Sequence, residues 1–205
     1  VHAMSSHDAP VEGAEVVVLL DEDGHAIGTA DKATVHHATT PLHLAFSCYL
    51  FDEDGQLLVT QRAQTKSVFP GIWTNSVCGH PGPGEPVVSA VARRVASELG
   101  GEAHGLRVVL PDFRYQAEMD GIVEYEACPV LVGSVRHAGP WRPDPTEVGG
   151  LTWVPWSAFV DDVRSGTFAV SPWCALQVEA LDALGPDPAQ WPDGDEALLP
   201  SALPR

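Results

Sequence analysis

The feature that most constrains the fold is one amphipathic helix with sharp ends, set among short β-like segments. From Pro86 to Leu99, valine and leucine recur at helical spacing, and Gly100-Gly101 follows the last of them. Proline is common at the first positions of a helix, and glycine is common just after its last residue. The runs on either side are rich in β-branched and aromatic residues and are separated by turn signals such as Asp-Gly. One early helix among hairpins predicts an α+β domain with a mixed β-sheet and flanking helices.

The other elements follow from the same patterns. Strands are expected at residues 15–20, 25–29, 44–51, 56–61, 107–110, 113–117, 122–132 and 151–154. Helices are expected at 156–164 and 172–184, the second capped by Ser171. Residues 15–184 are thus expected to form one domain, and residues 1–14 a disordered extension or cloning scar. The Pro/Asp/Ala-rich tail, 185–205, has too little apolar surface to fold alone.

The charge of the chain is strongly one-sided. Lys and Arg total 11 against 28 Asp and Glu, which gives a net charge of −17 at pH 7. Such a field repels nucleic acid and anionic lipid, so neither a nucleic acid nor a membrane is expected as a partner. Positions 32–114 differ, because seven cations, including the only two lysines, balance seven acids there. This neutral stretch predicts local capture of a small anion.

Cysteine spacing and hydropathy indicate the compartment. The four cysteines are far apart and form no Cys-x-x-Cys pair, and no basic start with an apolar stretch precedes them. The longest apolar runs fall far short of the roughly 20 residues that cross a bilayer. We therefore expect a reduced, cytoplasmic protein without a transmembrane helix.

No Gly-x-Gly-x-x-Gly or P-loop motif is present, which argues against dinucleotide and P-loop sites. The oligomeric state is left open.

The segment around the helix carries a more specific pattern. Glu85 follows Gly79 by six residues, and Arg93, Glu98 and Gly100 follow along the expected helix. This layout resembles the Nudix box, in which a glycine, a glutamate six residues later and a helical Arg-Glu-hydrophobic-x-Glu-Glu-x-Gly bind a metal diphosphate. Arg94 and Ser97, however, stand where Nudix hydrolases place glutamates that hold the metals for water activation. The resemblance implies a Nudix-like fold and is compatible with a loss of hydrolysis.

Five flanking segments sharpen this resemblance. They are residues 43–47, 70–81, 113–115, 123–129 and 171–173. In order and spacing they resemble the type I isopentenyl diphosphate isomerases, over about Val17 to Trp173. That resemblance implies a metal-dependent isomerase of isoprene biosynthesis, which interconverts isopentenyl and dimethylallyl diphosphate. Its partner would be a small isoprenyl diphosphate; whether longer prenyl diphosphates are accepted stays open.

The resemblance also implies a metal site of three histidines and two glutamates: His36, His43, His80, Glu124 and Glu126. His36 and His43 are expected to flank an extended segment, and the two glutamates lie two apart on a strand, hence on one face. Such a set suits a mixed N/O octahedral site. Ligand softness favours Mn, Zn or Fe, whereas the family is associated with Mg or Mn, so the metal is left open.

The proton chemistry is assigned by the same resemblance. Cys78 and Glu126 match the pair that moves the proton, without a decision on which is the acid. Tyr115 matches a hydroxyl that relays the proton beside the glutamate. Trp173 matches an aromatic that faces the cation, which an indole face stabilises by about 0.5 to 2 kcal/mol or more. Taken alone, Cys78 would more commonly be a small buried hydrophobic residue. The alternative for Tyr115 and Trp173 is ordinary packing.

The resemblance assigns diphosphate capture to four cations: Lys32, Arg62, Lys66 and Arg94. Charge-assisted bonds from these groups would orient the substrate. Glu98, one helical turn after Arg94, is placed for a second Mg ion bridged by the diphosphate; the alternative is an exposed i,i+4 ion pair of little value. His37 matches no motif position and is expected at the surface. Tyr125 lies where the family more often has a small polar residue, and strand alternation points it away from the metal face.

Two rival functions remain at this level. A Nudix diphosphate hydrolase would share the fold, but it lacks the expected glutamates at positions 94 and 97. A non-catalytic metal-binding or interaction domain would keep the histidines, but it would not need Cys78 together with Glu126.

Overall fold

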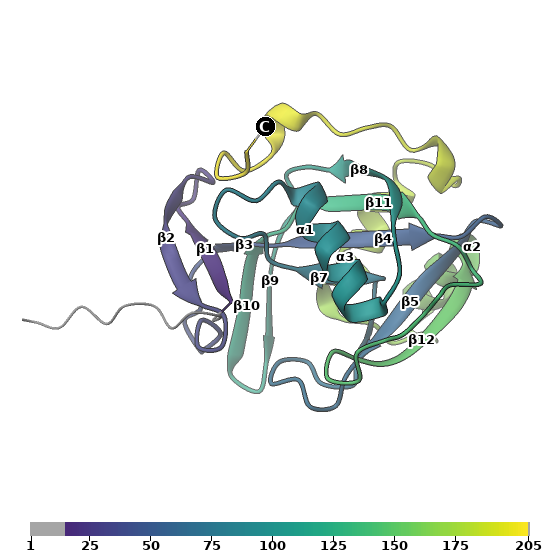
Figure 1. Cartoon of the computed structure of the whole chain (residues 1–205), viewed down its shortest axis with the longest axis horizontal. Coiled ribbons are helices and arrows are strands. Elements are labelled where there is room, and N and C mark those ends of the chain that lie inside the picture. Colours follow the sequence, from purple (N-terminus) through teal and green to yellow (C-terminus); the bar gives the residue numbers. More distant parts are fainter. Residues whose placement is uncertain (1–14, 205) are drawn as a thin grey trace, which may run out of the picture.

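Two β-sheets organise residues 15–204, which the computed structural model describes (Figure 1). The smaller sheet contains β1 (Val16–Leu20), β2 (Ala26–Asp31), β3 (His43–Leu44), β9 (Arg114–Met119) and β10 (Ile122–Ala127). The larger contains β4 (Phe46–Phe51), β5 (Gln56–Arg62), β6 (Trp73–Thr74), β7 (Val77–Gly79), β8 (His104–Leu110), β11 (Val130–Ser134) and β12 (Val148–Pro155). Their orders are β2-β1-β3-β10-β9 and β12-β5-β4-β11-β8, with β6 on β5 and β7 on β4. Mixed sheets with flanking helices confirm the α+β class.

Two expected strands are each divided between the sheets, which corrects the prediction. Residues 44–51 break at Ala45, and residues 122–132 break at Cys128-Pro129. At both breaks the chain leaves the smaller sheet and enters the larger one, so that β3 pairs in parallel with β10 and β4 with β11. Pro129 has no N–H for a continuous ladder, which favours the break. The two crossing points lie side by side, joined by a bond from Ala45 N to Ala127 O of 2.9 Å.

The helices form close to where they are expected. The first is α1 (Val87–Arg94), continued by a π-helical turn (Val95–Leu99) that ends at Gly100 with φ 67°. The others are α2 (Trp156–Ser165) and α3 (Pro172–Asp182); Ser171 caps α3 by accepting from Cys174 N at 3.3 Å. Within residues 15–204, no helix is long and apolar enough to span a membrane.

The larger sheet is covered on both faces, as Figure 1 shows, with α1 on one side and α2 and α3 on the other. Along β4, Phe46 and Leu50 pack with α1 residues such as Val91, whereas Tyr49 packs with residues of the other helices. All of these side chains are fully buried. This explains why β4 is largely apolar on both faces, with Ser47 as an exception, as strands in the middle of covered sheets are.

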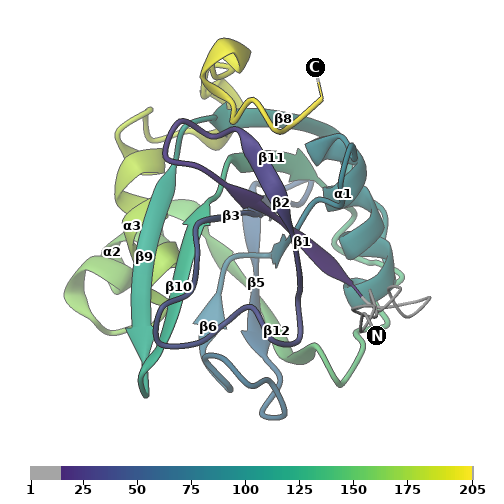
Figure 2. The same ribbon diagram turned by 90° about the vertical axis from the view of Figure 1, so that its left-hand side faces the viewer.

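The C-terminal tail packs along the edge of the domain, from the end of β8 to the β1–β2 hairpin (Figures 1 and 2). Trp191 is 3% exposed and contacts Trp156 edge to face at a centroid distance of 5.0 Å. Leu203 is 5% exposed and joins the core cluster beneath α1, and Ala202 N donates to Gly24 O. The extension expected at residues 1–14 lies outside the described residues.

Candidate functional site

A cavity of about 130 Å³ lies where the chain crosses from one sheet to the other. All but one of the predicted site residues line it: Lys32, His36, Arg62, Lys66, Cys78, His80, Arg94, Glu98, Tyr115, Glu124, Glu126 and Trp173. The exception, His43, is fully buried and contacts Glu126. The predicted residues therefore come together from both sheets, α1 and α3.

Three histidines and a glutamate form a tight group at the bottom of this cavity. The ligand atoms of His36, His43, His80 and Glu126 all lie within 4.8 Å of one another. The parallel pairing of β3 with β10 places His43 directly opposite Glu126. Oε1 of Glu126 lies 3.1 Å from Nε2 of His80 and 3.4 Å from Nε2 of His43. Glu124 stands outside the group of four and contacts Nε2 of His36 at 3.2 Å.

The donor atoms of this group suit a divalent cation. Nε2 of His36 and Nε2 of His43 are buried, and each lies close to a carboxylate oxygen without forming a hydrogen bond of good geometry within residues 15–204. Nδ1 of His43 lies 2.9 Å from the carbonyl oxygen of Pro41. If Nδ1 donates there, the lone pair of Nε2 faces Glu126 and His80, which is the arrangement that orients histidine ligands in metal sites. The residues present therefore fit a metal ion with mixed N/O ligands.

Burial and mutual contacts set the charges of the group. Burial lowers the pKa of His80 to about 4, so this imidazole is neutral at pH 7 and has a lone pair to offer. Burial alone would raise the pKa of Glu126, but contacts from His43 and His80 hold it well below its usual range. Burial raises the pKa of Glu124, and the charge of Glu126 adds to this effect.

Cys78 and Glu126 reach the cavity from different sheets. Cys78 lies on β7, in the larger sheet, and Glu126 on β10, in the smaller one. The hydroxyl of Tyr115 donates to Oε2 of Glu126 at 2.8 Å, and the ring of Trp173 lies 5.7 Å from that of Tyr115. Burial raises the pKa of Cys78 to about 11, so its thiol is protonated at neutral pH. The site thus holds a neutral thiol and an ionised carboxylate with a phenol beside it.

A buried network supports Cys78 from behind. The Cys78 thiol donates to Oδ1 of Asn75 at 3.1 Å and lies 3.5 Å from the hydroxyl of Ser47. Ser47 accepts from the amide of Gln177 at 2.9 Å, and that amide accepts from the hydroxyl of Tyr49 at 3.0 Å. Asn75, Ser47, Gln177 and Tyr49 are all fully buried. Because buried polar groups are costly unless paired, this network fixes the surroundings of the thiol.

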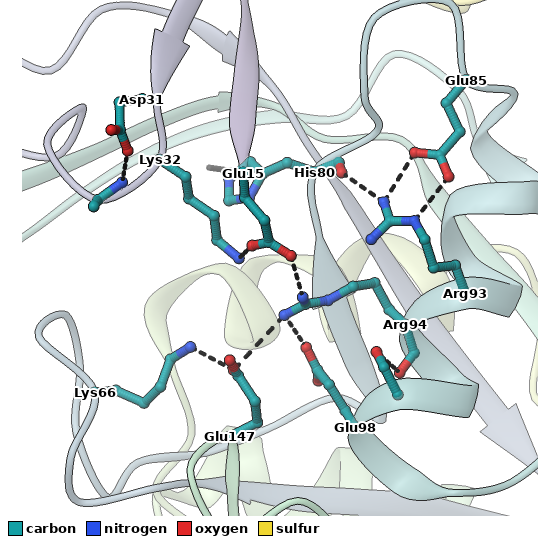
Figure 3. A network of polar contacts seen from close by, with 12 residues as sticks. Glu15, Asp31, Lys32, Lys66, His80, Glu85, Arg93, Arg94, Glu98 and Glu147 are labelled. Atoms are coloured by element: carbon teal, nitrogen blue, oxygen red, sulfur yellow. Dashed lines mark hydrogen bonds and ion pairs between the residues drawn. The ribbon is translucent and has the colours of Figure 1, made fainter. Parts of the chain in front are cut away.

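The opposite end of the cavity is lined by the predicted cations, and carboxylates are tied to three of them (Figure 3). Lys32 pairs with Glu15, and Lys66 pairs with Glu147. Arg94 contacts Glu15, Glu98 and Glu147. Arg62 instead donates to the carbonyl oxygens of Val68 and Phe69. The Arg94–Glu98 pair forms, but both side chains are nearly buried, so the exposed surface pair considered as an alternative is wrong.

Three expectations around the site are decided by the structure. His37 is exposed, and Tyr125 points away from the cavity toward Glu22 and Arg114, as expected. The segment between His36 and His43 is not extended throughout: it turns, because Thr40 Oγ1 accepts from His37 N and donates to His37 O.

Sequence reasoning missed several residues that shape the site. Ser47 and Asn75 lie inside segments already singled out, and their position beside His43 and Cys78 was the available signal. Gln177 lies four residues after Trp173, about one turn further along the expected helix, and that position was the available signal. Glu147 had no such signal, because it lies far from the motifs in sequence and reaches the site only through packing.

Comparison with known proteins shows which families the chain is similar to. The family model described as "NUDIX domain" matches residues 41–174. The chain is 52% identical over 189 residues to an isopentenyl-diphosphate Delta-isomerase of Saccharopolyspora erythraea, covering 92% of this chain and 96% of that protein. It is 58% identical over 173 residues to one of Mycolicibacterium vanbaalenii, covering 84% and 94%.

Solved structures support the fold alone. A crystal structure from Deinococcus radiodurans matches with a TM-score of 0.61 at 19% identity, covering 81% of this chain and 98% of that one. The MutT protein from Methanosarcina mazei matches with a TM-score of 0.55 at 18% identity, covering 70% and 94%. By its domain match and its identity to these relatives over most of its length, the chain belongs to the Nudix family and, within it, to the isopentenyl-diphosphate Delta-isomerases.

Proposed function

We propose that this chain isomerises isopentenyl diphosphate to dimethylallyl diphosphate by adding one proton and removing another. The observation that carries the proposal is the position of Glu126, which touches His43, His80 and Tyr115 and shares the cavity with Cys78. The relatives in Saccharopolyspora erythraea and Mycolicibacterium vanbaalenii carry the name of this activity. A small isoprenyl diphosphate is therefore the proposed partner.

In this proposal, the chain's own residues divide the work along the cavity. Lys32, Arg62, Lys66 and Arg94 bind the diphosphate and hold the alkene at the other end. A proton adds to the terminal CH₂ carbon, which leaves a tertiary carbocation at the neighbouring carbon. A proton then leaves the next carbon along the chain, and its electron pair forms the new double bond. Atoms and charge balance without any other reactant.

Cys78 and Glu126 are the proposed proton-transfer pair, one acting as acid and the other as base. Tyr115 donates to Glu126 and can return or receive its proton. Trp173 is 3% exposed and its ring lines the cavity, where a π face stabilises a cation without forming a bond to it. Glu126, Tyr115 and Trp173 are buried, and this burial limits the access of water that would otherwise capture the carbocation.

We assign the tight metal site to His36, His43, His80, Glu124 and Glu126, with Mg or Mn as the proposed ion and Zn as an alternative. When bound, the ion would fix the Glu126 carboxylate and stabilise its ionised form. Glu98 is the proposed contact for a second Mg ion carried by the diphosphate. Arg94 and Ser97, in the place of hydrolase glutamates, argue against metal-activated water and hence against diphosphate hydrolysis.

The test is turnover of isopentenyl diphosphate by the metal-loaded protein in deuterated water. We expect an acid-labile allylic product with deuterium in its new methyl group, detected by NMR, and no phosphate release. Deuterium-free product, or phosphate release that persists in Cys78→Ala, would reject the isomerase and favour hydrolysis.

A further inference from the structure

The diphosphate end of the cavity holds a continuous chain of ion pairs (Figure 3). Lys32 contacts Glu15, Glu15 contacts Arg94, and Arg94 contacts Glu147, which in turn contacts Lys66. Nζ of Lys66 lies 2.5 Å from Oε2 of Glu147, whereas Nη2 of Arg94 lies 3.7 Å from the same oxygen. Three of the four cations proposed to bind diphosphate, Lys32, Lys66 and Arg94, are therefore already paired with carboxylates.

The charges at this end nearly cancel. Four cations, Lys32, Arg62, Lys66 and Arg94, face three carboxylates, Glu15, Glu98 and Glu147. A free diphosphate, with several negative charges, must displace these carboxylates and then lie beside them. A diphosphate that carries a divalent ion brings the positive charge that the displaced carboxylates require. The arrangement thus distinguishes the metal complex from the free anion.

Glu147 is placed to respond to this difference. Its backbone is held, because its N–H donates to Asp144 O and its carbonyl accepts from Ala63 N, each at 3.0 Å. Its side chain is 26% exposed and lines the cavity, so the carboxylate can turn while the backbone stays in place. Glu98 is next to it: burial raises the pKa of Glu98, and the negative charge of Glu147 raises it further.

A second observation points to a ligand between these groups. Nε of Arg94 is buried and has no hydrogen-bond partner within residues 15–204. The Arg94 side chain is only 9% exposed and lines the cavity. A buried guanidinium nitrogen without a partner is costly and is satisfied by an incoming acceptor, such as a phosphate oxygen.

We propose that Glu147 makes the site selective for metal-bound diphosphate: it occupies Lys66 and Arg94 in the free protein, and on binding it moves to the metal beside Glu98. The proposal rests on the proposed function, since it concerns the same diphosphate end. Glu147 thereby disfavours free diphosphate, whose entry leaves the displaced carboxylate without a cation, and favours the complex, which supplies one. In this role Glu147 sets specificity and takes no part in the proton transfer.

The experiment measures binding of inorganic pyrophosphate by calorimetry, with Mg²⁺ and with a chelator in its place. We expect the parent to bind pyrophosphate at least about tenfold more tightly with Mg²⁺ than without it, because the ion gives the displaced carboxylates a charge-assisted contact. In Glu147→Gln, affinity for metal-free pyrophosphate should rise and the advantage of Mg²⁺ should fall by about tenfold. The control is Glu179→Gln, which removes an ion-paired carboxylate at the surface helix α3.

The outcomes separate the alternatives. A rise in metal-free affinity together with a smaller Mg²⁺ advantage supports the proposal, because a merely structural loss would weaken both measurements. An unchanged Mg²⁺ advantage, a fall in both affinities, or a parent that does not bind pyrophosphate would overturn it. Glu147→Asp keeps the charge and should retain most of the Mg²⁺ advantage; if Glu147→Gln does not fold, loss of that advantage in Glu147→Asp overturns the proposal.

Pyrophosphate contains no alkene, so this test is independent of isomerisation. If the parent prefers metal pyrophosphate in the expected way but does not convert isopentenyl diphosphate, the proposed function fails and the selectivity stands. If it isomerises substrate and Glu147→Gln keeps the Mg²⁺ advantage, the selectivity alone fails.

Discussion

The two ends of the cavity differ in how their polar groups are held. At the end proposed for proton transfer, Cys78 and Tyr115 lie on strands, and buried partners fix each of them. At the end proposed to bind diphosphate, Lys66 and Glu147 are long, partly exposed side chains that hold each other by an ion pair. A reaction through a carbocation needs fixed groups and little water, whereas capture and release of an anion need partners that can exchange. The comparison teaches that buried partners fix the groups proposed to transfer protons, whereas partly exposed ion pairs hold Lys66 and Glu147 at the other end.

The largest expected effect comes from the rigid end. General acid and base groups typically contribute about 10² to 10⁴ each, so Cys78→Ala and Glu126→Gln should each lower kcat by at least that range. Cys78→Ser, with a much weaker acid, should be nearly as poor as alanine. Steady-state isomerisation and pyrophosphate binding are measured together. If Cys78→Ala and Glu126→Gln both keep activity within tenfold of the parent, Cys78 and Glu126 are not the proton-transfer pair.

The metal group gives the next test. The parent should carry about one tightly held divalent ion, and His80→Ala should lose it because a buried donor that faces Glu126 is removed. His37→Ala is the matched control, since that histidine is exposed and outside the group. Elemental analysis of dialysed protein reads the result. If His80→Ala and His43→Ala both retain the metal content of the parent, the ion is not bound at this site.

At the exchangeable end, a smaller effect of a different kind is expected. Lys66→Gln removes a cation that is proposed to anchor substrate through a contact worth about 1.5–3 kcal/mol, so KM should rise by about 10- to 100-fold while kcat changes little. Arg164→Gln, which breaks surface pairs with Glu179 and Asp182, is the control. If Lys66→Gln lowers kcat and leaves KM unchanged, Lys66 acts on the chemical step, as the groups at the other end are proposed to do, and not on substrate binding.

The smallest effect should come from behind the thiol. Gln177→Met keeps the side-chain volume but leaves Ser47 and Tyr49 without their amide partner. We expect kcat to fall by about tenfold with KM unchanged, and the free energy of unfolding to fall by about 1–3 kcal/mol. Kinetics and chemical denaturation read the two effects. The exposed Gln116→Met on β9 is the control, and a Gln177→Met variant that is less stable but fully active would show that the network supports only the fold.

The fold was predictable where local patterns were strong. The helix beginning after Pro86, the Asp54-Gly55 hairpin and the Ser171 cap all follow from short-range rules, and the structure contains each of them. The boundaries at Ala45 and Pro129 were missed, because an apolar run looks the same whether it stays in one sheet or crosses between two. The tail was expected to be unable to fold alone, and its single buried tryptophan, Trp191, gave no sign of where it packs.

The sequence by itself determined which chemical groups the protein has: the ordered motifs hold three histidines, two glutamates, a cysteine and four cations, and the resemblance assigned them to one site. Only the tertiary structure decided how these groups are held. The crossing of two strands between the sheets places His43 against Glu126, Gln177 reaches Ser47 from α3, and Glu147 reaches Lys66 from a loop 81 residues away. Motifs and periodicity report interactions between neighbours in the chain, whereas these contacts depend on packing between distant elements, which a single sequence does not encode in any local pattern.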